Sequence, residues 1–297
     1  MSMKLANLQN PIITYSLRSR RANWRIITVT VLAVLSYGPA CLIFGSYILT
    51  QLVFDADLKN FVRDLDEVGA TIFYVTAVFL LFIVTLFAPA MAASTIAGEK
   101  QRQTLDLLLV TLLPTRSIIV GKLVSALVYT LLLIGVVWPL VIFCLFLGGV
   151  DLVELSVAGI LLIVTSLAFT TVGLFMSSLS RTTTNAAMLT YGVALPALLI
   201  GPFLAMLPVT IVLLLADANY KLLEAVNFYG WSLAASLNPL SAAIYSGIMH
   251  AEEGGWILLE TTPYHLLYPW LIYIIFYGFL TFFLMKLTMR RLEKMGS

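Results

Sequence analysis

Charged residues are scarce in this sequence. Only 11% of its 297 residues are Asp, Glu, Lys or Arg, whereas 61% are hydrophobic and the mean hydropathy is +1.00. Soluble domains contain about 25% charged residues, so this chain has too little polar surface to dissolve in water. Its apolar residues form continuous runs and do not alternate with polar ones, which favours membrane-spanning helices over the strands of a membrane barrel.

The sequence also offers few groups for a metal, a cofactor or a disulfide. Its two cysteines, Cys41 and Cys144, lie inside apolar runs, where a thiol packs as a small hydrophobic group. We expect no disulfide, no metal site and no cofactor on this chain, and no nucleic-acid partner. The first residues are polar and basic without a short apolar core and a cleavage site, so no signal peptide is evident.

Six apolar stretches are long enough to cross a hydrocarbon core, which needs about 20 helical residues. They lie at about 24–52, 70–97, 118–149, 155–179, 186–215 and 266–288. The sequence therefore predicts an all-α polytopic membrane protein with a single transmembrane domain, residues 1–297. Residues 216–265 contain several Trp and Tyr residues, so we expect an external helical loop at the outer leaflet, with a loosely packed loop as the alternative.

The distribution of charge predicts the orientation of these spans. The segments on one side of the membrane hold 14 of the 17 basic residues, and those on the other side hold 12 of the 15 acidic ones. Cytoplasmic segments carry an excess of Lys and Arg. Both termini and the connection at 98–114 are therefore expected in the cytoplasm, and the expected location is the plasma membrane, the inner membrane of a bacterium.

The expected spans contain no Asp, Glu or His in their interiors. Ion-coupled carriers usually need titratable groups at that depth, so this class is disfavoured, although backbone carbonyls or hydroxyls can still coordinate Na⁺. Ser and Thr residues between 165 and 180 could line a pore, but small hydroxylated residues more often allow helices to approach closely. In the fifth span Pro196, Gly201 and Pro202 interrupt the helical pattern and suggest either an outer gate or a structural kink.

No phosphate-binding loop is present in the sequence. Gly121-Lys122 is followed by Leu123 where such a loop requires Ser or Thr, and Arg116 stands five residues before Gly121 where the loop requires Gly. We therefore do not expect this chain to bind ATP or to be an enzyme. If it works against a gradient, the energy must come from another polypeptide.

The connection between the second and third spans has the most informative pattern. Read as a helix from about Glu99 to Pro114, it places Glu99, Arg102, Gln103 and Asp106 on one face and several leucines on another. We expect Glu99 to pair with Arg102 and Arg102 with Asp106. An amphipathic elbow resting on lipid is one interpretation, and a docking helix for a cytoplasmic partner is the other.

This connection resembles the signature of ABC-2 type permeases. The resemblance rests on Gly98-Glu99-Lys100, then Thr104-Leu105-Asp106 with three further leucines, then Pro114 and Gly121-Lys122. Residues 10–13, Asn-Pro-Ile-Ile, with Leu17-Arg18 resemble the cytoplasmic entry helix of one branch of that family, although Tyr15-Ser16 depart from its usual charged residues. Asn238-Pro239 resembles a recurrent feature of the last external loop.

The resemblance implies the membrane subunit of an exporter, with a transmembrane domain similar to those of type V exporters. Two copies of a separate ATP-binding subunit would hold ATP and Mg²⁺, and a second permease subunit, identical or different, would complete the complex. The implied contacts with the ATP-binding subunit are Glu99, Lys100, Arg102, Thr104, Leu105 and Asp106. The implied entry helix, residues 1–23, contains Ile12, Ile13, Leu17 and Arg18. A membrane scaffold, sensor or assembly factor that docks a cytoplasmic partner is the alternative function.

Overall fold

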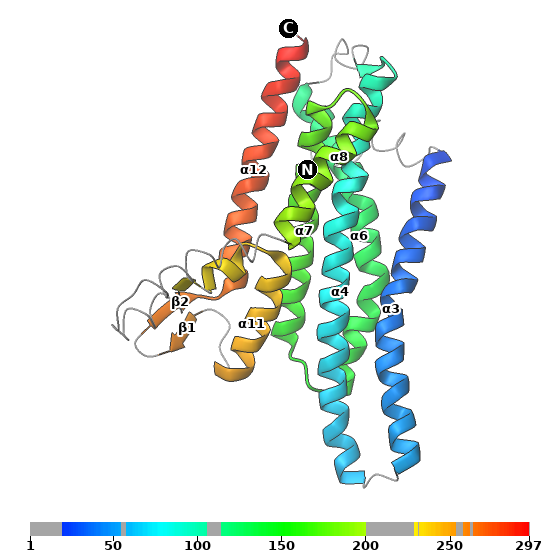
Figure 1. Ribbon diagram of the computed structural model, residues 1–297, viewed down its shortest axis with the longest axis vertical. Coiled ribbons are helices and arrows are strands. Elements are labelled where there is room, and N and C mark those ends of the chain that lie inside the picture. Colours follow the sequence, from blue (N-terminus) through cyan, green and yellow to red (C-terminus); the bar gives the residue numbers. More distant parts are fainter. Residues whose placement is uncertain are drawn as a thin grey trace, which may run out of the picture.

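The structure is a bundle of long helices with one short hairpin. The computed structural model describes residues 20–54, 58–105, 114–199, 229–230, 232–253, 258–261 and 264–296. Its helices are α3 (Arg20–Phe54), α4 (Leu58–Gln101), α6 (Thr115–Leu147), α7 (Leu152–Leu179), α8 (Thr183–Leu199), α11 (Pro239–Glu253) and α12 (Pro269–Gly296). Figure 1 shows that α3, α4, α6, α7 and α12 run roughly parallel to one another.

Five of the described helices are long and apolar enough to cross a membrane, namely α3, α4, α6, α7 and α12. Each of them overlaps a stretch that the sequence predicts to span. The expected span 186–215 begins in α8 and continues into residues that the structure does not describe. The helical, multi-pass architecture is confirmed, whereas the sixth crossing and the cytoplasmic termini stay predictions.

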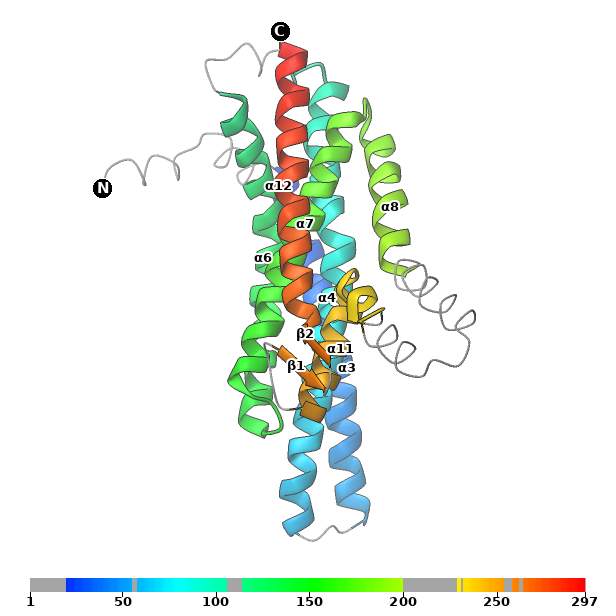
Figure 2. The same cartoon turned by 90° about the vertical axis from the view of Figure 1, so that its left-hand side faces the viewer.

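Helix α4 is the centre of the bundle. It contacts α3, α6, α7 and α8, and its most extensive interface is with α7 (Figures 1 and 2). Its 44 residues correspond to a length of about 66 Å at 1.5 Å per residue, roughly twice the 30 Å of a hydrocarbon core. The helix therefore extends beyond the membrane core, with its charged first turns at one end and Gly98–Gln101 at the other.

Small residues allow α4 and α7 to approach closely. A Cβ atom added at Gly173 of α7 would lie 2.5 Å from the Pro89 carbonyl oxygen and 3.0 Å from the Ala92 Cβ of α4. Interfaces between membrane helices favour such residues because dispersion contacts between closely packed backbones stabilise the association. The α4–α7 pair consequently has little freedom to change its spacing.

The buried hydroxyl groups of α7 are largely satisfied within their own helix. Thr165, Thr170 and Thr171 donate hydrogen bonds to the carbonyl oxygens four residues earlier, at 2.5–2.7 Å. Thr165 also lies 2.9 Å from the Tyr273 hydroxyl of α12 and so joins the two helices. These contacts favour helix packing over a pore lining as the role of the Ser and Thr residues in α7.

A two-stranded sheet interrupts the expected helical loop at 216–265. β1 (Leu258–Thr261) pairs antiparallel with β2 (Tyr264–Leu267), with Leu258 opposite Leu267. The expected helical loop is therefore helical only in part, because Pro263 lies between the two strands in the sequence and has no N–H with which to continue a helix. α11 precedes the sheet and packs against α4, α7 and α12 (Figure 1).

Asn238 connects α8 to α11. Its Nδ2 atom donates to the carbonyl oxygens of Leu198 at 2.6 Å and Ala197 at 3.2 Å, near the end of α8. Its Oδ1 atom accepts from the Leu240 N–H at 2.8 Å, which caps the start of α11. Pro239 occupies the first helical position, where its missing N–H costs nothing. The Asn-Pro pair thus fixes the relative position of two helices.

Candidate functional site: the C-terminal end of α4

The candidate docking segment begins as the last turn of α4. The sequence predicts a new helix from Glu99, but α4 continues through Gln101 and ends in a compact turn. The N–H of Gln103 donates to the Lys100 carbonyl at 3.1 Å, and the N–H of Thr104 donates to the Glu99 carbonyl at 3.0 Å. Gln103 has φ 59°, so this is a Schellman motif in which glutamine takes the left-handed position usually held by glycine.

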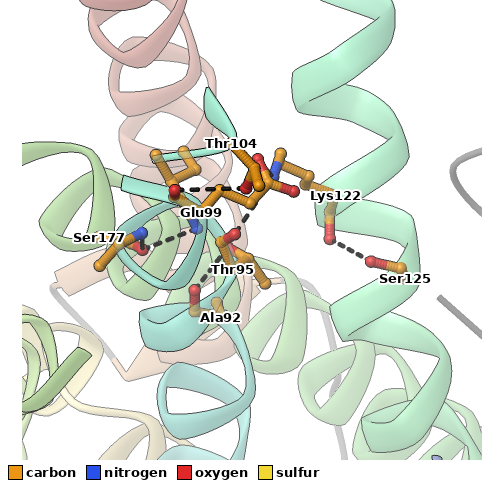
Figure 3. A network of polar contacts seen from close by, with 9 residues as sticks. Ala92, Thr95, Glu99, Thr104, Lys122, Ser125 and Ser177 are labelled. Atoms are coloured by element: carbon orange, nitrogen blue, oxygen red, sulfur yellow. Dashed lines mark hydrogen bonds and ion pairs between the residues drawn. The ribbon is translucent and has the colours of Figure 1, made fainter. Parts of the chain in front are cut away.

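A buried ion pair lies directly beneath this turn. The Lys122 ammonium of α6 is 2.6 Å from the Glu99 Oε2 atom, and the two side chains are 5% and 31% exposed. Oε2 accepts no well-aligned hydrogen bond, so the interaction between Glu99 and Lys122 is a close contact between opposite charges. Lys122 also donates to the Thr95 carbonyl at 3.1 Å, so both of its acceptors belong to α4 (Figure 3).

This ion pair corrects the predicted partner of Glu99. The sequence predicts that Glu99 pairs with Arg102, but Glu99 pairs with Lys122, and Arg102 is exposed to solvent. The reason is that a lysine at the start of a largely apolar helix must find a counter-charge. Asp106, the other predicted partner of Arg102, lies outside the described residues.

Helix α7 holds the same end of α4 through a serine and a lysine. The Ser177 Oγ atom accepts from the backbone N–H groups of Ile96 and Ala97, at 3.0 and 2.9 Å (Figure 3). The Lys100 ammonium donates to the Ser178 carbonyl oxygen near the end of α7. Such bonds between helices add to the van der Waals packing in a membrane protein, so α4 is fixed to α7 as well as to α6.

Two further contacts flank the turn. The Gln101 side-chain oxygen accepts from the Thr183 N–H at 3.3 Å and from its hydroxyl at 3.1 Å, which ties α4 to the first residue of α8. Leu105 is only 5% exposed and packs in a cluster that includes Ile119 of α6 and Leu292 of α12. Leu105 was predicted as a contact for a partner, but its side chain faces the interior because the turn directs the chain back into the bundle.

The remaining predicted contact residues differ in accessibility. Arg102, Gln103 and Thr104 are exposed and form the surface of the turn, whereas Glu99 and Lys100 are partly buried by their partners. Arg181 and Arg291, both exposed, lie close enough to Lys100 to repel its ammonium electrostatically. The end of the bundle at Gly98–Gln101 therefore presents a short polar turn in a basic surrounding.

The other predicted sites lie mostly outside the described residues. Residues 1–19, which include Ile12, Ile13, Leu17 and Arg18, are not described, and neither are Gly201 and Pro202. Pro196 lies inside α8, which continues past it to Leu199. Within the part of the chain that the structure describes, no group of His, Cys, Asp or Glu side chains could hold a metal ion.

The sequence did not predict the roles of three residues at this site, namely Lys122, Ser177 and Thr183. Only Lys122 carried a usable signal, because a lysine inside an expected span requires a partner. The residues that pair here are separated by more than 20 positions, and no local pattern indicates which of them meet.

A comparison with known families matches residues 11–287 to a family described as ABC-2 family transporter protein. The match covers all the described helices except part of α12. A comparison with curated proteins finds no match.

Proposed function

The chain belongs to the ABC-2 transporter family and is a membrane permease subunit of an ABC transporter, and from this premise we propose that it is half of an exporter driven by a separate ATP-binding subunit. Two copies of that subunit would hold ATP and Mg²⁺. A second permease subunit, identical or different, would complete the pathway. The proposed location is the inner membrane of a bacterium, with both termini in the cytoplasm.

The observation that carries this proposal is the construction of the α4 end. The exposed turn Arg102–Thr104 follows the last turn of α4, which is fixed to α6 by Glu99 and Lys122 and to α7 by Ser177. A turn that only contacted lipid would not need its helix to be fixed in this way. A turn that receives force from a motor needs a fixed helix, because a flexible contact would absorb the movement before it reached the spans.

In the proposed cycle, ATP binding draws the two ATP-binding subunits together and moves the turns that they contact. The long helix α4 then carries this movement toward the opposite side of the membrane.

We further propose that the entry helix at 1–23 is a second contact with the ATP-binding subunit. Pro196, Gly201 and Pro202 are proposed to form a gate near the outer leaflet.

The turn can be tested by reversing its charge. Arg102→Glu should lower the affinity for the ATP-binding subunit by about tenfold or more, because arginine is enriched among the interface residues whose loss costs about 2 kcal/mol or more, and about 1.4 kcal/mol is a factor of ten in affinity. The measurement is the amount of ATP-binding subunit that co-purifies with the tagged chain from native membranes, followed by titration with the isolated subunit.

A matched control is Lys294→Glu, the same charge reversal at an exposed position near the end of α12. It should leave co-purification within about twofold of the unaltered chain, since surface charges outside a contact contribute little. Equal losses for both variants would show a non-specific electrostatic effect. Recovery of the intact chain without any ATP-binding protein would contradict the proposed function and favour a membrane scaffold.

A further inference from the structure

We propose that the Glu99–Lys122 ion pair is a positioning device that makes the end of α4 and the start of α6 move as one unit. A movement of the turn would then displace α4, α6 and α7 together, and the end of α4 would not separate from the start of α6. This inference rests on the proposed function, because it concerns how the same turn transmits movement. Neither residue touches a substrate in this account.

Lys122 is bonded to α4 through its ammonium group. Its side chain is 5% exposed, and its two partners, the Glu99 carboxylate and the Thr95 carbonyl, are both on α4. A displacement of α4 relative to α6 would leave the ammonium buried without either partner. An unpaired buried charge is strongly unfavourable, so the two helices resist separation at this level far more than apolar contacts alone would require.

Glu99 takes part in both the turn and the ion pair. Its carbonyl oxygen accepts from the N–H of Thr104 at 3.0 Å and from the Thr104 hydroxyl at 3.3 Å, which shapes the turn. Its carboxylate contacts Lys122 of α6. Glu99 therefore links the exposed turn directly to Lys122 of α6 (Figure 3).

Helix α7 holds the adjacent turn of α4. Ser177 accepts from the N–H groups of Ile96 and Ala97, three and two residues before Glu99. Since α7 already fixes this part of α4, the ion pair determines where α6 stands relative to the α4–α7 unit. Loss of the pair should release α6 and loosen the exposed turn, while the helical part of α4 up to Ala97 stays with α7.

The test uses Glu99→Gln, Lys122→Met, the double variant and the exchanged pair Glu99→Lys with Lys122→Glu. Single variants leave one group without its partner, whereas the double variant removes both charges and is expected to fold normally, because neutral replacement of a whole buried pair is often tolerated. Arg116→Gln is the matched control, since it removes a charge from an exposed position on the same helix.

The first readout is the mobility of a spin label at Arg102→Cys in the full-length permease alone. Cys41, which is exposed, and Cys144, which is buried, are replaced beforehand by Ser and Ala. We expect a more mobile label in both single variants and in the double variant, an unchanged label in Arg116→Gln, and partial recovery in the exchanged pair. An unchanged label in the folded double variant would overturn the inference.

The second readout is ATP hydrolysis by the assembled complex. We expect the double variant to retain as much ATP-binding subunit as the unaltered chain and to keep its KM for ATP. Its kcat should fall toward that of the isolated subunit by about fivefold or more, the scale of a typical coupling between sites. An unchanged kcat together with a mobile label would also overturn the inference, since the turn would then not need a fixed base.

The two readouts separate this inference from the proposed function. If the unaltered permease binds no ATP-binding subunit, the proposed function fails. The inference that the ion pair transmits a movement of that subunit then fails with it. If the subunit binds and the label and kcat do not respond to the double variant, only the inference fails. A merely stabilising ion pair would change the unfolding temperature and leave both readouts unaltered.

Discussion

Alanine in place of Gly173 should unfold the permease at a temperature several degrees lower than the unaltered chain. The new Cβ atom would lie 2.5 Å from the Pro89 carbonyl oxygen, and a backbone atom in the middle of a long helix cannot move aside without the helix. Overpacking of this kind costs about 1–3 kcal/mol. Thermal unfolding of the detergent-solubilised protein, followed by tryptophan fluorescence, measures the effect.

Gly135→Ala is the matched control for this substitution. Gly135 is also a helical glycine, in α6, but a Cβ atom there meets nothing within 4 Å. Alanine favours a helix over glycine by about 0.5–1 kcal/mol, so this variant should unfold at the same temperature or slightly higher. A Gly173→Ala variant as stable as Gly135→Ala would contradict the close α4–α7 contact.

The Asn238→Ala substitution should be at least as disruptive, because the side chain has two separate functions. Loss of the cap on α11 costs about 1 kcal/mol. Loss of the donor leaves the Leu198 carbonyl without the 2.6 Å bond, and an unsatisfied buried group costs about 1–3 kcal/mol more. The expected result is a lower unfolding temperature in detergent, measured on the same material as the Gly173 variant.

Asn238→Ser separates the two functions of this residue. Serine is a good cap for α11, but its shorter side chain has no amide to donate to the end of α8. The unfolding temperature should therefore rank asparagine above serine and serine above alanine. Equal temperatures for the serine and alanine variants would show that the cap contributes nothing, and equality of all three would refute the connection.

The sequence predicted the long elements of this fold well because their signal is local. A run of apolar residues is sufficient to indicate a span, and the five described spanning helices overlap the expected ranges. The ends of helices were harder to predict, since a continuous helical pattern runs through Glu99. Helix α4 ends at Gln101, and Gln103 takes the left-handed conformation although it is neither glycine nor proline, the residues that usually mark the end of a helix.

The site itself was predictable in position but not in construction. Glu99 and Lys100 were identified from a motif, yet their partners Lys122 and Ser178 come from other helices. The motif predicted that Leu105 contacts a partner, whereas the turn directs its side chain into the bundle, where it is buried. Asn238-Pro239 could have been interpreted further, because a cap residue followed by proline is the standard start of a helix.

The proximity of Lys122 to Glu99 also affects the net charge of this end of the bundle. The two opposite charges lie 2.6 Å apart and carry no net charge as a pair. In the folded protein, Lys122 therefore adds nothing to the attraction between this basic surface and anionic lipids. Any contribution of this surface to the proposed cytoplasmic orientation comes from exposed bases such as Arg116, Arg181 and Arg290.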